Sequence, residues 1–91
     1  MDNNKILEVI AKYREMFERK NIPKKEFPLG SYVLADKTSI LAHCHNMLDD
    51  MERFVKEGRR SKAFRWLGFI QGCLWSTDIY TVEQMANQNR P

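Results

Sequence analysis

The sequence contains few cysteines, no long hydrophobic run and little excess charge, and each of these shortages excludes a class of protein. Among its 91 residues only Cys44 and Cys73 are cysteines, whereas a disulfide-stabilised scaffold carries a denser set. No run reaches the roughly 18 consecutive apolar residues of a membrane span, and no charged-then-apolar leader opens the chain. We therefore expect a soluble, cytosolic protein with two reduced thiols and no membrane contact.

Charge of one sign is also scarce, since 15 basic residues face 12 acidic ones and leave a net charge of +3. A protein that binds nucleic acid without sequence preference usually has a larger and more segregated basic excess. One local cluster departs from this balance, because four cations fall within seven positions with no acid among them. This basic cluster comprises Arg59, Arg60, Lys62 and Arg65.

Hydrophobic residues recur every three or four positions along most of the chain, which predicts α-helices. The first helix should begin near residue 3 and end at residue 19, before the stop at 21–23. Asp36 is a suitable N-cap for the second helix, and Gly58 is a suitable residue just beyond its end. Thr81 and Gln84 fit a capping box that begins a short last helix.

These signals predict an all-α fold in one domain spanning residues 1–91. We expect a small helical bundle built on an antiparallel helix hairpin, at about residues 37–57 and 60–77, because the link between these helices is short. An N-terminal amphipathic helix and a short C-terminal helix complete the bundle. Residues 21–36 should form an ordered loop, with a short extended piece at 32–34.

The stretch at 63–75 is the most hydrophobic part of the chain, and only Arg65 and Gln71 in it are strongly polar. A helix there is apolar almost all round, so we expect it to be the most buried helix of the protein. Gly68 and Gly72 lie four apart on one face, where a missing side chain lets another backbone come close. Each glycine costs a helix roughly 0.5–1 kcal/mol relative to alanine, so close packing should compensate for it.

Trp66 and Trp75 are nine positions apart and cannot share one face of a helix. One of them can fill the core while the other lies elsewhere, and large aromatics near a surface are typical of interface anchors. The candidate interface with a second copy of the chain therefore comprises Trp66, Gly68, Gly72 and Trp75. A single densely packed monomer core is the alternative explanation.

His43, Cys44 and His45 resemble a metal cluster, but the geometry of a helix argues against it. Successive residues turn by about 100°, so the two histidines point to nearly opposite sides. An apolar setting also raises the pKa of a thiol and makes it a poor nucleophile. The four glycines match neither a Walker loop nor a dinucleotide-binding fingerprint. We therefore predict no catalytic residue, no metal and no cofactor, and a protein that is not an enzyme.

The basic cluster lies at the start of the third predicted helix, where its charges oppose the helix dipole and repel one another. An anion at that end, such as a phosphate, would relieve both effects. Lys24 and Lys25 could add a second basic wall, with Tyr13 as a stacking surface. The candidate ligand-binding residues are Arg59, Arg60, Lys62, Arg65, Tyr13, Lys24 and Lys25. A solvated face that improves solubility is the alternative.

The second half of the chain, about residues 42–90, resembles a group of small uncharacterised proteins encoded by tailed bacteriophages and prophages. The resemblance rests on the block Arg-Trp-Leu-Gly-Phe-Ile-Gln-Gly at 65–72, with Ala-His-Cys-His at 42–45, Leu-Trp at 74–75 and Tyr-Thr-Val-Glu at 80–83. It implies a phage origin and expression in the cytoplasm of a bacterial host. Small accessory phage proteins often bind a host component: a defence protein, a nucleotide immune signal, DNA or a polymerase.

Together these observations predict a phage accessory protein with a counter-defence role. We expect a non-enzymatic homo-oligomer that captures a phosphate-bearing small ligand, such as a nucleotide immune signal. An inhibitor or adaptor that binds a host protein is the first alternative. A weak DNA-binding regulator is the second, although the apolar helix after Gly58 offers few polar side chains to base edges.

Overall fold

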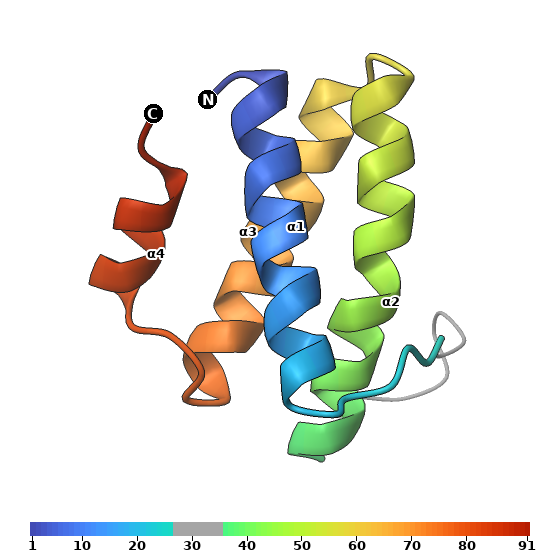
Figure 1. Cartoon of the computed structure of the whole chain (residues 1–91), viewed down its shortest axis with the longest axis vertical. Coiled ribbons are helices and arrows are strands. Elements are labelled where there is room, and N and C mark those ends of the chain that lie inside the picture. Colours follow the sequence, from blue (N-terminus) through green and yellow to red (C-terminus); the bar gives the residue numbers. More distant parts are fainter. Residues whose placement is uncertain (27–35) are drawn as a thin grey trace.

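The structure is a computed structural model that describes residues 1–26 and 36–91, and within these ranges the chain forms four helices (Figure 1). They are α1 (Asn3–Arg19), α2 (Lys37–Lys56), α3 (Arg60–Ser76) and α4 (Val82–Asn89). The predicted all-α fold is confirmed, and the helix bounds agree with the sequence signals to within a residue or two. The extended piece predicted at 32–34 lies outside the described residues.

Short polar side chains begin three of the helices. Asp2 accepts a hydrogen bond from the backbone N–H of Lys5, and Asp36 accepts one from that of Ser39 at 3.1 Å. The predicted capping box is confirmed: Thr81 Oγ1 accepts from the N–H of Gln84, whose side chain accepts from the N–H of Thr81. By contrast, α3 begins at an arginine whose side chain makes no capping hydrogen bond.

A residue with left-handed backbone conformation (positive φ) follows each of α1, α2 and α3. Gly58 has φ of +79°, and the N–H of Arg59 donates to the carbonyl of Phe54 at 2.8 Å, which is the six-to-one bond of a Schellman motif. Asn21 and Asp78 take the same conformation at the ends of α1 and α3, with φ of 57° and 64°. The turn at Gly58 is short enough to fold α3 back along α2, so the predicted hairpin is confirmed.

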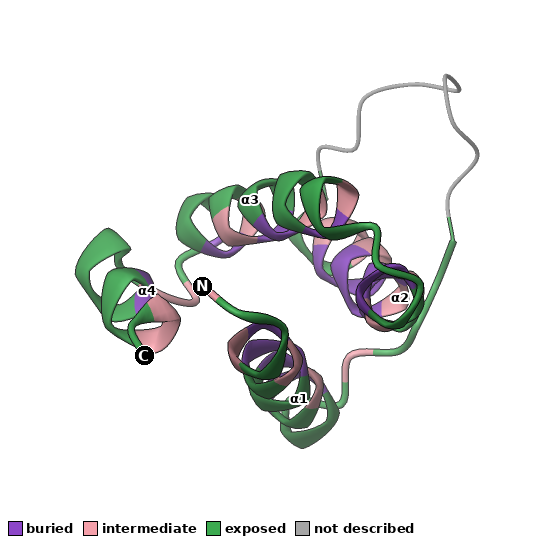
Figure 2. Ribbon diagram, turned by 90° about the horizontal axis from the view of Figure 1, so that it is seen from above, coloured by how far each residue is buried: buried purple, intermediate pink, exposed green. Residues whose placement is uncertain are grey.

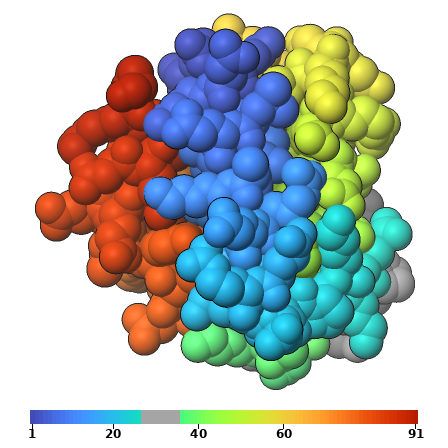
Figure 3. Space-filling view, in the orientation of Figure 1, coloured from blue at the N-terminus to red at the C-terminus, as the bar shows by residue number. Residues whose placement is uncertain are grey.

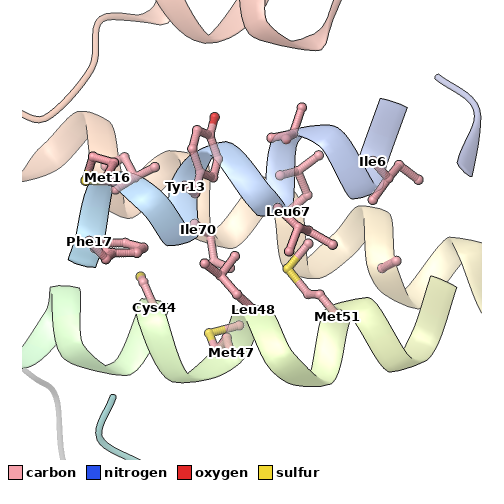
Figure 4. Packing of buried hydrophobic residues seen from close by; sticks show 14 of the residues in the cluster. Ile6, Tyr13, Met16, Phe17, Cys44, Met47, Leu48, Met51, Leu67 and Ile70 are labelled. Atoms are coloured by element: carbon pink, nitrogen blue, oxygen red, sulfur yellow. The ribbon is translucent and has the colours of Figure 1, made fainter. Parts of the chain in front are cut away.

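The hydrophobic core lies where α1 packs across the α2–α3 hairpin, as Figure 4 shows for Leu67 and Ile70 between the side chains of α1 and α2. Seen from the front, α1 covers the middle of the molecule between α4 and α2 (Figure 3). Six residues of α1 and nine of α2 are buried. Only four residues of α3 are buried, namely Ala63, Leu67, Ile70 and Leu74. The expectation that α3 is the most buried helix is therefore wrong, because its apolar residues face in two directions and the described residues cover only one of them.

Candidate functional site

The side of α3 turned away from the core is an exposed surface, which we call the outer face (Figure 2). It comprises Phe64, Arg65, Gly68, Phe69, Gly72 and Trp75. These positions lie on one side of a helix that turns about 100° per residue, opposite the four buried positions. Trp75 is 61% exposed and Phe69 is 53% exposed, so large aromatic rings stand in solvent at two places on the same helix.

The two glycines of the outer face are open. A Cβ atom added at Gly68 or at Gly72 would meet no atom of residues 1–26 or 36–91 within 4 Å. The close backbone approach that the sequence predicted for these glycines is therefore not made by the described residues of this chain. Packing among the residues that the structure describes does not explain why glycine occupies either position.

The two tryptophans have the divided placement that their spacing predicted. Trp66 is partly buried against the core, and its ring meets that of Phe54 edge-on at 4.9 Å between centroids. Trp75 projects from the outer face. Of the predicted interface residues, Gly68, Gly72 and Trp75 therefore share one surface, and Trp66 lies on the side of α3 that faces α2. Phe69, which the sequence reasoning omitted, joins the first group.

The basic cluster is compact in the sequence but divides in space. Arg59 and Lys62 lie over the ring of Phe54, at 5.1 and 4.6 Å from its centroid. Arg60 donates a hydrogen bond to the carbonyl of Met1. Arg65 stands on the outer face instead. The four cations therefore point toward three different parts of the surface and do not converge on one point.

Ion pairing also differs among these cations. Arg59 is 4.0 Å from a carboxylate oxygen of Glu57. Within the part of the chain that the structure describes, Arg60, Lys62 and Arg65 form no ion pair with a carboxylate. Arg60 and Lys62 lie instead over the rings of Phe64 and Phe54, at 5.6 and 4.6 Å from the ring centroids.

Tyr13 is fully buried and links three helices. Its hydroxyl donates to Oε1 of Gln88 at 2.6 Å and accepts from Nε2 of Gln71 at 2.9 Å. Gln71 and Asn89 exchange two further hydrogen bonds, at 2.8 and 3.2 Å, which attach α4 to α3. Burial raises the pKa of Tyr13 to about 12. The hydroxyl thus serves a structural network, and its ring stacks on Tyr80 at 5.7 Å between centroids.

The prediction that Tyr13, Lys24 and Lys25 complete a pocket with the basic cluster is therefore wrong. The ring of Tyr13 is inside the molecule and has no face for a ligand. Lys24 binds a carboxylate oxygen of Asp49 at 2.9 Å, and the backbone N–H of Lys25 donates to Ala42. These lysines follow α1, whereas the basic cluster begins at the far end of the α2–α3 hairpin (Figure 1).

A half-open groove of about 370 Å³ lies between α2 and α3. Its lining residues are Glu26, His43, Asn46, Met47, Asp50, Trp66 and Phe69. None of the seven predicted ligand-binding residues is among them, and the two carboxylates make the groove unsuited to a phosphate. The sequence reasoning missed this groove, because its lining comes from three separate segments.

The two histidines point to different sides, as their spacing predicted. The ring of His45 is buried against Phe17, at 5.1 Å between centroids, and its Nδ1 lies 2.8 Å from the carbonyl of Ile22. Because a carbonyl can only accept, Nδ1 donates this bond. The ring of His43 meets Phe69 edge-on at 6.5 Å. Within the described ranges, no three or more His, Cys, Asp or Glu side chains are grouped so that they could hold a metal ion.

Both cysteines are unbridged, and Cys44 is buried while Cys73 is partly buried. A hydrogen bond with Cys73, together with burial, raises the pKa of Cys44. The same hydrogen bond lowers the pKa of Cys73. Neither thiol reaches the outer face, so the pair belongs to the α2–α3 packing.

The comparisons with known proteins add no family. Among the described residues, no helix combines the length and the apolar character needed to cross a membrane. No protein-family model, no curated protein and no solved structure matches the chain. The resemblance to phage proteins therefore stays a prediction.

Proposed function

We propose that the chain is a non-enzymatic protein-binding module whose binding surface is the outer face of α3. The observation that carries this proposal is the exposure of Trp75 and Phe69, at 61% and 53%, on one side of a single helix. Isolated exposed apolar residues are ordinary, but an aligned group of large ones marks an interaction surface. Tryptophan and arginine are among the residues most enriched in energetically dominant interface contacts, and this face carries one of each, Trp75 and Arg65.

The outer face is also shaped for another helix. Gly68 and Gly72 form a shallow strip between the rings of Phe69 and Trp75. No described atom lies within 4 Å of the position that a Cβ atom would take at either glycine. A rod-like partner can approach the backbone closely along this strip. An inhibitor or adaptor role, which the phage resemblance implies for a host protein, requires a surface of this kind.

Site-specific photo-crosslinking tests this function in cells that produce the protein. We replace Phe69 with the photoreactive benzoylphenylalanine, which keeps an aromatic ring at the position, and place the same residue at exposed Lys12 of α1 as a control. We expect a covalent adduct with a protein, either another one or a second copy, from position 69 and none from position 12. Absence of any protein adduct at position 69 would refute the proposal.

A second function is supported by a separate observation, the uncapped start of α3. Its first N–H groups have no side-chain acceptor, and Arg60, Lys62 and Arg65 form no ion pair with a described carboxylate. Free N–H groups and cations together attract phosphate. We propose as the alternative that a phosphate-bearing ligand, such as a nucleotide immune signal, binds at the start of α3 beside Arg59, Arg60 and Lys62, without Arg65 on the outer face and without Tyr13, Lys24 or Lys25.

Thermal-shift measurements with cyclic nucleotides and pyrophosphate test this alternative. A ligand that binds only the native state stabilises it by RT ln(1 + [L]/Kd), so the melting temperature rises as the ligand concentration increases. The charge-neutralising variant Arg60→Gln should abolish the shift, whereas Lys12→Gln, which removes one cation from the exposed side of α1, should leave it unchanged. No shift for any of these ligands would eliminate the nucleotide function.

A further inference from the structure

We propose that a second copy of this chain occupies the outer face, with α3 lying antiparallel to α3 of the other subunit about a two-fold axis near position 70. The inference rests on the proposed function and names the partner of the same surface. Three features support this antiparallel pair: the order of side chains along α3, the charges at the two ends of the helix, and the open positions at Gly68 and Gly72.

The outer face is complementary to itself when reversed. Arg65 and Trp75 are ten positions apart and are placed symmetrically about position 70. At about 1.5 Å per residue, each lies about 7.5 Å from the proposed axis. An antiparallel copy at a small crossing angle therefore sets Arg65 opposite the partner's Trp75, and the reverse contact forms at the other end. An arginine over an indole ring is a favourable cation–π pair, and Arg65 has no carboxylate partner among the described residues.

Gly68 and Gly72 occupy the middle of this arrangement. Reversal about position 70 brings Gly68 opposite Gly72 of the partner subunit, so two stretches of bare backbone meet where the helices cross. Glycine costs each site roughly 0.5–1 kcal/mol within a helix, and no atom of the described chain lies within 4 Å to account for it. A helix from a second copy supplies the close contact that glycine allows.

Charge selects the antiparallel direction. The cations Arg60, Lys62 and Arg65 stand at the positive, N-terminal end of the α3 dipole, where they are unfavourably placed. In the antiparallel pair this end lies beside the negative, C-terminal end of the partner helix, which Asp78 follows. A parallel pair would instead bring the two basic ends together, and like charges in contact cost binding energy.

Sedimentation equilibrium of the intact chain from about 1 to 500 µM provides the first measurement. We expect twice the monomer mass at the upper concentrations. The variant Gly72→Leu should shift the protein to monomer because the added side chain blocks the crossing. Its matched control, Ala11→Leu, adds the same side chain at an exposed position of α1 and should leave the dimer intact. Circular dichroism confirms that both variants are folded.

The register is tested by a charge exchange. Arg65→Glu or Trp75→Lys alone should weaken dimerisation at least tenfold, and the double variant should restore it through pairs between Glu and the partner's Lys. Positions 65 and 75 are about 15 Å apart within one helix, so the rescue cannot arise inside one subunit. A monomer at every concentration, or a dimer insensitive to Gly72→Leu, would overturn the inference.

Failure of this inference can be told apart from failure of the proposed function. A monomeric chain that still yields an adduct to another protein from position 69 removes the second copy as partner and retains the binding surface. A monomeric chain with no adduct removes both.

Discussion

The two sides of α3 have similar side chains and opposite surroundings. The inner side places Leu67, Ile70 and Leu74 in the core, whereas the outer side leaves Phe69 and Trp75 largely in solvent. Both sides are apolar enough to be buried. The hydrophobicity of a helix indicates how much of its surface is favourable to bury. The arrangement of the other helices decides how much of that surface is buried within one subunit.

The largest expected effect is a difference in stability between a substitution on the inner side of α3 and one on its outer side. Leu74→Ala removes a fully buried side chain and should lower the free energy of unfolding by about 2–5 kcal/mol. Trp75→Ala, one position away, should change it by less than about 0.5 kcal/mol when dilute protein is measured below its association range. Urea denaturation followed by circular dichroism gives both values. Equal losses would mean that Trp75 is covered by its own chain.

A smaller effect concerns the polar link between α3 and its neighbours. Tyr13→Phe leaves Gln71 and Gln88 each without one hydrogen-bond partner and should cost about 1–2 kcal/mol at neutral pH. The folded-state pKa of Tyr13, about 12, lies above the ordinary value of 10, so its contribution is complete below pH 10 and is lost as pH rises toward 12.

The wild type and the Tyr13→Phe variant should therefore converge in stability at high pH. Denaturation at pH 7, 9 and 11 measures the difference between them. A constant gap over this range would show that the hydroxyl titrates normally in the folded protein. Tyr80→Phe is a useful comparison. Burial raises the pKa of Tyr80 as well, but Tyr80 is only partly buried and its hydroxyl forms no hydrogen bond with a described residue of α4, so its removal should cost less at neutral pH.

A substitution in the glycine strip on the outer side of α3 should increase stability. Gly72→Ala should raise the free energy of unfolding of the dilute monomer by about 0.5–1 kcal/mol, because the new methyl group meets no atom of the described part of the chain and alanine favours a helix. Thermal denaturation at micromolar concentration measures the gain. A loss of stability would reveal an unrecognised close contact within the subunit.

The smallest effect comes from an ordinary charged surface, where the chain pairs its own groups. Although partial burial opposes it, hydrogen bonds from Lys24 and Arg14 hold the pKa of Asp49 below its usual value. Asp49 is half exposed, so Asp49→Asn should cost only about 0.5 kcal/mol at neutral pH.

The sign of its pH dependence follows from the lowered pKa. The contribution of Asp49 is present above its unfolded pKa, about 3.9, and is lost as pH falls through the lower folded value. The stabilities of the variant and of the wild type should therefore approach each other as the pH falls below about 3.9. A gap that widened in acid would contradict the ion pairs with Lys24 and Arg14.

The fold was predictable in those parts where short-range chemistry decides. Asp36, Gly58 and the Thr81–Gln84 pair each act on backbone groups within a few residues, so their effects can be recognised from spacing alone. Asn21 and Asp78 take the same left-handed conformation as Gly58. The sequence predicted the end of the first helix before 21–23 and that of the third near residue 77. It did not predict the left-handed geometry, because a residue other than glycine is uncommon in that conformation.

The candidate site was predictable only in part, for a geometric reason. The spacing of Gly68, Gly72 and Trp75 was enough to place them on one surface. Phe69 could have been assigned to the same surface, because its angular position around the helix differs from that of Leu67 and Ile70. The division of the basic cluster in space was not predicted, because neighbouring positions on a helix diverge by about 100° and closeness in sequence is not closeness in space. Tyr13 was misjudged because its partners, Gln71 and Gln88, come from distant segments.

By itself, the sequence determined that the chain is helical, where each helix begins and ends, and that its third helix is apolar on more than one side. These properties depend on interactions within a few residues. Only the tertiary structure decided that Ile70 faces the core while Trp75 faces solvent, and that Tyr13 binds two glutamines instead of a ligand. Such outcomes depend on which surfaces meet when α1 packs across the α2–α3 hairpin, and no local interaction specifies that meeting.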